Sequence, residues 1–219
     1  MAFIIWMIVG AMPSRAQTVD EKMWVGVSTS IPLEQNLRLE IDTQGRFGDD
    51  SNGIYETIVS GFLTYRPNPK LSLSLGYQRN ESERRQPETV ENRLRQQVAG
   101  QLAQLGGGAL SGRLRLEQRF RSGTDEVQIR LRPQLAYVRP FRTGSQTRWI
   151  ISHESFLASR VDWNNQIGYF RMRNQAAVRF PLAKILQAEA GYLNQYEFGK
   201  RGRSDTMDHI GLFTLIFTL

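Results

Sequence analysis

Apolar and polar residues alternate with a period of two through almost every segment of the chain after residue 20. Successive side chains of a β-strand point to opposite faces of its sheet, so this alternation indicates strands. It is strong in residues 109–120, where Leu110, Leu114, Leu116 and Phe120 share one face and Arg113, Arg115, Glu117 and Arg119 share the other. No segment sustains the 3.6-residue period of an amphipathic helix, so the chain is expected to be all-β.

Eleven segments fit strands: 23–32, 37–48, 54–66, 70–77, 89–104, 109–120, 127–137, 147–160, 166–180, 185–198 and 208–219. The polar-rich segment 89–104 is the best helix candidate, but Leu94, Val98 and Leu102 also fit one face of a strand, which we favour. All of these segments but 70–77 have ten or more residues, long enough for a tilted bilayer crossing, which takes about 9–11 residues. Short and longer polar connections alternate, as do the periplasmic turns and external loops of outer-membrane barrels.

The sequence therefore predicts a transmembrane antiparallel up-and-down β-barrel with its polar loops at the cell surface and its C-terminus in the periplasm. Bacterial single-chain barrels have even strand numbers, so ten or twelve strands are expected. A soluble sandwich or lipocalin also alternates, but its turn signals recur every 8–12 residues. The strand-plus-connection units of this chain are longer.

The N-terminal segment has the composition of a secretion signal. Residues 2–12 form an apolar run that is too short to span a bilayer, and Ser14-Arg15-Ala16 follows with a small residue at each end. We expect cleavage after Ala16, which gives a signal peptide at 1–16 and a barrel domain at 17–219. No Lys or Arg precedes the apolar run, so an uncleaved anchor or a buried strand is the alternative.

The C-terminal segment places Phe213, Leu215, Phe217 and Leu219 on one strand face. Outer-membrane barrels end similarly, on a strand that the barrel-assembly machinery recognises, so these four residues are the predicted assembly signal. The usual last residue of such proteins is Phe, and Leu219 departs from that pattern. The alternative is an ordinary buried strand.

Residues 23–219 resemble an uncharacterised bacterial outer-membrane family, domain of unknown function 2490. The similar stretches are LEQRF, SGTDEV and IRLRPQLAY within 112–137, HESFL at 153–157, and AGYLNQ at 190–195. The resemblance implies a barrel in the bacterial outer membrane. It implies no activity and supplies no catalytic motif.

Charge is concentrated on the face predicted to point inward. The chain has 28 Lys and Arg against 21 Asp and Glu, for a formal charge of +7. Their alternation along the predicted strands places these arginines inside: Arg93, Arg95, Arg113, Arg115, Arg119, Arg121, Arg130, Arg132, Arg171, Arg173 and Arg179. The acidic residues predicted to point inward are Glu40, Glu91, Glu117, Glu189 and Glu197. Because these arginines alternate with lipid-facing leucines, no nucleic-acid partner is expected.

Two functions fit this interior. Long side chains largely fill the lumen of a small barrel, so we favour a structural barrel plugged by Arg–Glu pairs. The alternative is a narrow anion-preferring channel, because rings of arginine favour anions.

Catalysis is not expected, although some outer-membrane barrels are lipid hydrolases or acyltransferases. The candidates that the sequence offers are His153 and Ser155, which share a face while Glu154 points the other way. Positions i and i+2 are about 7 Å apart along a strand, so contact between them requires bent side chains. With two histidines and no cysteine, no metal site is expected, and no cofactor.

The tyrosines and tryptophans after the expected signal peptide are predicted to form girdles at the membrane interfaces: Trp24, Tyr55, Tyr65, Tyr77, Tyr137, Trp149, Trp163, Tyr169, Tyr192 and Tyr196. The basic loop at residues 200–203 is expected to face lipopolysaccharide phosphates. The expected partners are thus outer-membrane lipid, lipopolysaccharide and the barrel-assembly machinery, and the oligomeric state stays open.

Overall fold

The computed structural model describes residues 18–48, 53–83, 88–159, 163, 167–200 and 202–219. The expected signal peptide at 1–16 lies outside these residues, as does Gln17. No helix in the described ranges is long and apolar enough to cross a membrane.

The described residues form eleven β-strands. They are β1 (Thr18–Glu34), β2 (Leu37–Gly48), β3 (Gly53–Asn68), β4 (Leu71–Ser82), β5 (Thr89–Leu105), β6 (Gly108–Arg121), β7 (Gln128–Pro140), β8 (Arg148–Ala158), β9 (Gly168–Ala183), β10 (Leu186–Glu197) and β11 (Thr206–Thr218). Each matches one of the eleven segments expected from alternation. The polar segment that competed as a helix is β5.

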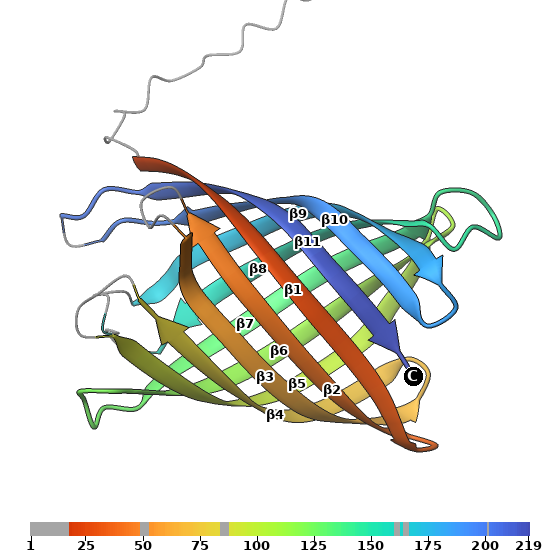
Figure 1. The fold of residues 1–219 in the computed structure, drawn as a ribbon, viewed down its shortest axis with the longest axis horizontal. Coiled ribbons are helices and arrows are strands. Elements are labelled where there is room, and N and C mark those ends of the chain that lie inside the picture. The colour runs from red at the N-terminus through yellow and green to blue at the C-terminus, as the bar shows by residue number, and fades with distance from the viewer. Residues whose placement is uncertain (1–17, 49–52, 84–87, 160–162, 164–166, 201) are drawn as a thin grey trace, which may run out of the picture.

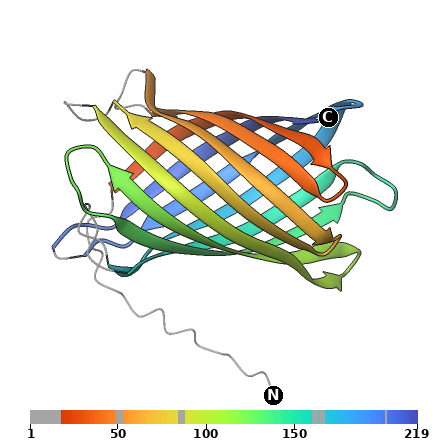
Figure 2. The ribbon, with the colours of Figure 1, turned by 90° about the horizontal axis from the view of Figure 1, so that it is seen from below.

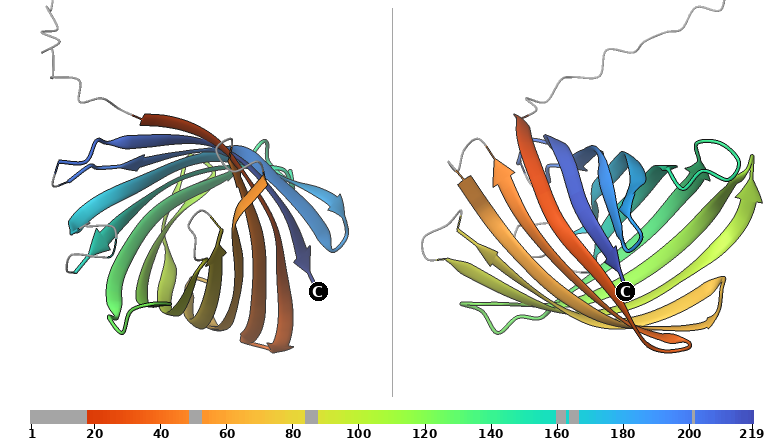
Figure 3. Two further views of the ribbon diagram at one scale, coloured as in Figure 1. Left: turned by 60° about the vertical axis from the view of Figure 1, so that its left-hand side comes forward. Right: turned by 45° about the vertical axis from the view of Figure 1, so that its right-hand side comes forward.

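The strands close into a single barrel, in which each strand pairs antiparallel with its neighbours along the chain (Figure 1). The exception is the closing pair, β1 and β11, which run parallel from Thr18↔Thr206 to Ser30↔Thr218. These two strands lie side by side and point the same way in Figure 3. In a meander of alternating direction, an odd number of strands brings the first and last strands together in the same direction.

The expected strand number of ten or twelve is therefore wrong, and so is the expectation that every pair is antiparallel. The alternation had marked all eleven strands. The expected number was changed from eleven to ten or twelve because bacterial single-chain barrels have even strand numbers. However, nothing in the hydrogen-bonding geometry of strands forbids a parallel pair at the closure.

Alternation separates the two faces of the barrel wall. Arg95, Arg115 and Glu117 are buried inside, whereas Leu75, Leu94 and Leu114 are 61%, 44% and 43% exposed on the outside. An apolar groove of about 620 Å³ also lies on the outer wall, across β2 to β7. The buried and charged side chains thus occupy the interior, and the wall presents apolar side chains outward.

The connections differ in length between the two ends of the barrel (Figure 2). Four of the connections at one end, 35–36, 69–70, 106–107 and 184–185, have two residues each. Gly106 and Gly107 adopt positive φ angles of 53° and 80°, the left-handed backbone that a two-residue hairpin turn favours. The fifth connection at this end, 141–147, is longer. All connections at the other end are longer than two residues.

Gly76 of β4 is required by close approach. A Cβ atom at this position would lie 2.6 Å from the carbonyl oxygen of Gly61 and 2.6 Å from Cε1 of the Phe62 ring, which covers it. We expect Gly76→Ala to lower the free energy of unfolding by about 1–3 kcal/mol, as overpacking does. Urea unfolding in detergent micelles measures this. Gly61→Ala is the control, because its Cβ would meet its nearest atom at 3.9 Å. Equal stability of the two variants would contradict the prediction.

Candidate functional site

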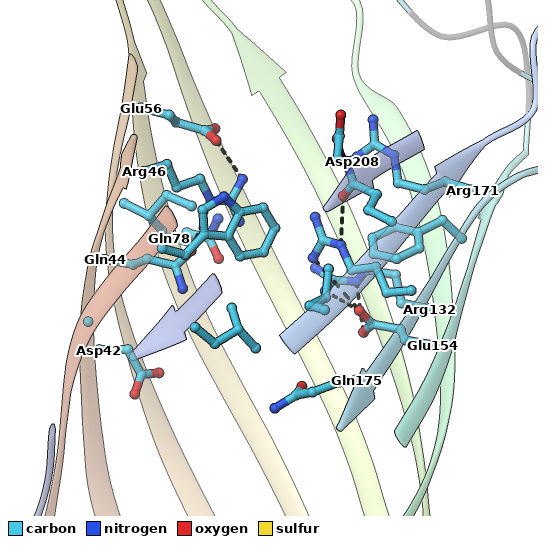
Figure 4. Close-up of a pocket in the computed structure, with 18 of the residues that line it drawn as sticks. Asp42, Gln44, Arg46, Glu56, Gln78, Arg132, Glu154, Arg171, Gln175 and Asp208 are labelled. Carbon is cyan, nitrogen blue, oxygen red and sulfur yellow. Dashed lines mark hydrogen bonds and ion pairs between the residues drawn. The ribbon is translucent and has the colours of Figure 1, made fainter. Parts of the chain in front are cut away.

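The barrel encloses a cavity of about 730 Å³ that receives lining side chains from all eleven strands. Figure 4 shows the lining residues on facing walls, with Arg46 and Glu56 on one side and Arg132 and Glu154 on the other. The open space between these groups means that the ion pairs line the cavity without filling all of it.

Glu117 lies at the centre of the charged network. Its side chain is completely buried, and both carboxylate oxygens are engaged. Arg130 Nε donates to one oxygen at 2.7 Å, and Arg132 Nη1 donates to the other at 2.8 Å. Arg95 approaches at 3.8 Å from the adjacent strand. These contacts follow from the register, which places Glu117 opposite both Arg95 and Arg130.

Arg132 links Glu117 to a second buried carboxylate, Glu154. Arg132 donates to Glu154 through Nε at 3.1 Å and Nη2 at 2.8 Å, so the contact is bidentate. Arg113 also donates to Glu154, and Arg173 lies 3.9 Å from it. The two glutamates and the arginines around them form one network across β5 to β9, which we call the Glu117–Glu154 network.

Further ion pairs extend around the inner wall. Glu91 binds Arg119 through two hydrogen bonds of 2.7 and 3.0 Å and also Arg93 at 2.6 Å. Other pairs among the described residues are Arg46–Glu56, Arg171–Glu197, Arg179–Glu189, and the pairs of Lys22 with Asp208 and Asp20.

Basic residues outnumber acidic ones at the cavity wall. Among the described lining residues, eleven are Lys or Arg and eight are Asp or Glu. Arg115 donates to Gln97 Oε1 through Nε at 2.9 Å and through Nη2 at 2.7 Å. No carboxylate of the described residues lies within 4.0 Å of its guanidinium. The cavity therefore has an excess of positive charge.

Aromatic rings also lie inside the barrel, beneath the arginines. Phe156 is 1% exposed, and the guanidinium carbons of four described arginines lie within 6 Å of its ring centre: Arg132, Arg173, Arg130 and Arg171. Phe62 lies under Arg95 at 4.2 Å. Trp24 lies under Arg46 at 3.8 Å and donates to the Tyr55 hydroxyl at 3.1 Å.

The placement of Trp24 and Tyr55 corrects the expectation that they belong to interfacial girdles. They are 4% and 7% exposed and line the cavity. The ring centre of Trp163 lies 5.0 Å from the guanidinium carbon of Arg119 and 5.7 Å from that of Arg121. Both arginines are on the inward face, so Trp163 is also near the interior. Other expected girdle residues do point outward, with 38–48% exposure: Tyr65, Tyr77, Trp149, Tyr169 and Tyr192.

Most residues predicted to face inward line the cavity: Arg93, Arg95, Arg113, Arg115, Arg119, Arg130, Arg132, Arg171, Arg173, Glu91, Glu189 and Glu197. Glu117 lies behind this surface. Glu40 accepts from Thr64 at 3.1 Å, and Arg179 binds Glu189.

Several charged residues that line the cavity were not among the residues predicted to face inward: Lys22, Asp42, Arg46, Glu56, Glu154 and Asp208. The signal for Glu154 was present, because it alternates with His153 and Ser155.

A second polar group lies on the outer face of the barrel. His153 Nε2 is 3.1 Å from Ser155 Oγ, and His153 Nδ1 is 2.7 Å from Asn174 Oδ1. The side chains of His153 and Ser155 therefore do meet, as i, i+2 neighbours on β8. Asn174 was missed by sequence reasoning, because only the register of β8 with β9 places it opposite His153.

Comparison with known proteins shows which family the chain belongs to. The family described as a protein of unknown function, DUF2490, matches residues 21–206. The chain belongs to this family. The resemblance inferred from short motifs is thus confirmed for this DUF2490 protein. An uncharacterized protein of Methylorubrum extorquens is 27% identical to it over 192 residues, which cover 85% of this chain and 82% of the relative. No solved structure matches the DUF2490 chain.

The other predicted sites of the DUF2490 protein have the following positions. Phe213, Leu215 and Phe217 alternate with Leu212 and Thr214, which line the cavity, so they face outward along β11. Lys200 of the basic loop donates to the carbonyl oxygen of Tyr169 at 2.7 Å. Within the described ranges, no group of three or more His, Asp or Glu residues is arranged to hold a metal ion.

Proposed function

We propose that this DUF2490 protein is an outer-membrane barrel whose lumen admits small anions. The observation that carries the proposal is the pairing of an apolar outer wall with an arginine-rich cavity. The outer wall exposes side chains such as Leu75, Leu102 and Ile151 at 58–61%, where a soluble protein would lose the free energy of burying them. In a bilayer, that wall faces hydrocarbon.

The cavity supports the preference for anions. It has a volume of about 730 Å³ and more basic than acidic lining residues. Arg115 is held by an amide instead of a carboxylate, so its charge is less neutralised than that of Arg132. Arginine side chains that line a pore favour anions over cations.

The Glu117–Glu154 network favours a second candidate, a closed structural barrel. Arg130 and Arg132 are each held by two or more contacts to buried carboxylates, and Phe156 packs beneath both. Side chains fixed in this way resist displacement, and they narrow the path that a solute would take.

Planar-bilayer conductance of the folded protein distinguishes the two candidates. We expect steady current steps, and a reversal potential in a salt gradient that reports preference for anions. Arg115→Gln is expected to lower the anion-to-cation permeability ratio by about half or more, because it removes a cavity charge that has no direct ion pair with a carboxylate of the described residues. Arg139→Gln is the matched control, since Arg139 is exposed and does not line the cavity.

Two results would overturn the channel. A barrel that is folded, as judged by its gel mobility before and after boiling, but that passes no current would favour the structural candidate. Preference for cations would contradict the role given to the arginines.

A further inference from the structure

The outward-facing polar group has the geometry of a nucleophile, a base and an orienting residue. Ser155 Oγ lies 3.1 Å from His153 Nε2, and the other ring nitrogen, Nδ1, lies 2.7 Å from Asn174 Oδ1. Nucleophilic catalysis by serine requires a base within hydrogen-bond reach and a third group that orients the base. We propose that Ser155, His153 and Asn174 form a catalytic triad that hydrolyses carboxylic esters of membrane lipids.

The hydrogen bonds fix the tautomer that this chemistry needs. The side-chain oxygen of Asn174 has no proton, so it can only accept, and His153 Nδ1 must carry the hydrogen. Nε2 is then unprotonated and accepts from the Ser155 hydroxyl. His153 is thereby ready to take the proton of Ser155 when the oxygen attacks.

Rigid strands position all three residues. Ser155 and His153 share the outer face of β8, and His153 is directly opposite Asn174 of β9 in the register. Residues on strands of a closed sheet hold their geometry better than residues on loops do. The pairing β7–β8 is interrupted beside this site, between Leu131↔Leu157 and Gln134↔Glu154. Pro133, which has no N–H to donate, lies in this gap.

The location selects lipid as the substrate. Ile151 and Leu135, which flank His153 on the outer face, are 58% and 51% exposed. Ser155 lies three residues from the Ala158 end of β8, and Asn174 lies six residues from the Gly168 end of β9; these ends carry the longer connections. The acyl esters of lipids lie at the boundary between headgroups and hydrocarbon, so their acyl chains would contact the apolar wall while the ester reaches Ser155.

The reaction proceeds in two steps, acylation of Ser155 and hydrolysis of the acyl–serine ester. Ser155 Oγ bonds to the ester carbonyl carbon while its proton passes to His153 Nε2. The bond from that carbon to the alcohol oxygen breaks, and His153 returns the proton to the departing alcohol, which is the deacylated lipid. Water, activated by His153, then attacks the acyl–Ser155 ester, and its products are a free fatty acid and the regenerated serine hydroxyl.

A purely structural role explains the group less well. Polar side chains on the lipid face of a barrel are costly, and His153 has a polar partner at both ring nitrogens, one of them a serine hydroxyl. His209 illustrates such a pairing, since its Nδ1 contacts the Tyr192 hydroxyl at 2.5 Å on the same outer face. His209 has no serine at hydrogen-bond distance in the described structure, so it is a matched control for His153.

The test measures fatty-acid release by the folded full barrel in mixed micelles. One arm contains phospholipid and the other contains lipopolysaccharide, so that the source of the ester is distinguished. We expect the unmodified protein to release fatty acid in one arm or both, and Ser155→Ala and His153→Ala to lower the rate by more than about 100-fold. Asn174→Ala should lower it less, and His209→Ala should leave it unchanged.

Covalent labelling by a fluorophosphonate provides a second readout that needs no lipid. Labelling should map to Ser155 and disappear in His153→Ala, while heat-dependent gel mobility shows that each variant is folded. Folded protein that releases no fatty acid in either arm and takes up no label would overturn the proposal, as would Ser155→Ala that retains full activity. The inference shares only the membrane placement with the proposed channel. Because the assay is independent of conductance, the two can fail separately.

Discussion

Replacing Glu117 by alanine is expected to lower the free energy of unfolding by about 3–5 kcal/mol, because the change leaves buried arginines without their counter-ion. Arg130 and Arg132 donate to the two oxygens of Glu117 at 2.7 and 2.8 Å, and the carboxylate has no exposed surface. Among the described residues, Glu117 is the carboxylate that pairs with Arg130, so its loss would leave the Arg130 guanidinium without an ion-pair partner. Urea unfolding in micelles, followed by tryptophan fluorescence, measures the change.

The control is an ion pair of similar length at the surface. Arg79 and Glu81 lie 2.7 Å apart, but their side chains are 49% and 55% exposed. Exposed pairs contribute about 0–1 kcal/mol, so Glu81→Ala should change stability little. If Glu117→Ala cost no more than Glu81→Ala, the Glu117–Glu154 network would not be the stabilising element of the interior. The double variant Glu117→Leu with Arg130→Leu should recover part of the loss, since replacing both charges removes the unpaired one.

Replacing Phe156 by alanine is expected to cost about 3–5 kcal/mol, because it empties the centre of the arginine cluster. Phe156 packs edge-on against Phe170, with ring centres 6.3 Å apart, and supports Arg132 at 4.5 Å and Arg173 at 4.8 Å. The same unfolding measurement applies. Loss of the ring should also loosen Arg132, and the bilayer current of the variant should become noisier than that of the parent.

Phe156→Leu separates packing from the interaction of guanidinium groups with the ring face. Leucine retains most of the apolar volume but has no π face, so its cost should be smaller, about 1–2 kcal/mol. A leucine variant as unstable as the alanine variant would show that the ring face dominates. An alanine variant as stable as the parent would contradict the supporting role of Phe156 altogether.

Alternation within the sequence was sufficient to predict the all-β class and the position of every strand. It works because the two faces of this wall differ so strongly, as Leu114 and Arg115 on β6 illustrate. The strand number was mispredicted because a rule drawn from other barrels was preferred to the residues. Closure of the barrel depends on the pairing of β1 with β11. The two-residue alternation along the sequence does not indicate which strands pair at the closure.

The lumen was predictable in part for the same reason. Parity places Arg95, Arg115 and Glu117 on one face, but it does not say which arginine meets which carboxylate. That pairing depends on the register between strands, which brings Glu154 opposite Arg173. Asn174 shows the same limit on the outer face, since it is 21 residues from His153 along the chain and opposite it in the sheet.

For the proposed outer-membrane barrel, we expect the parallel closure to affect how the chain is inserted into a bilayer. Thr18 and Thr206 begin their strands at the same end, while Thr218, where β11 stops, lies at the opposite end (Figure 1). A hairpin that enters a bilayer returns the chain to the side from which it came, so five hairpins account for ten crossings and leave one strand to be translocated alone. Peptide tags placed just before Thr18 and just after Leu219 should therefore be accessible to protease from opposite sides of a sealed vesicle.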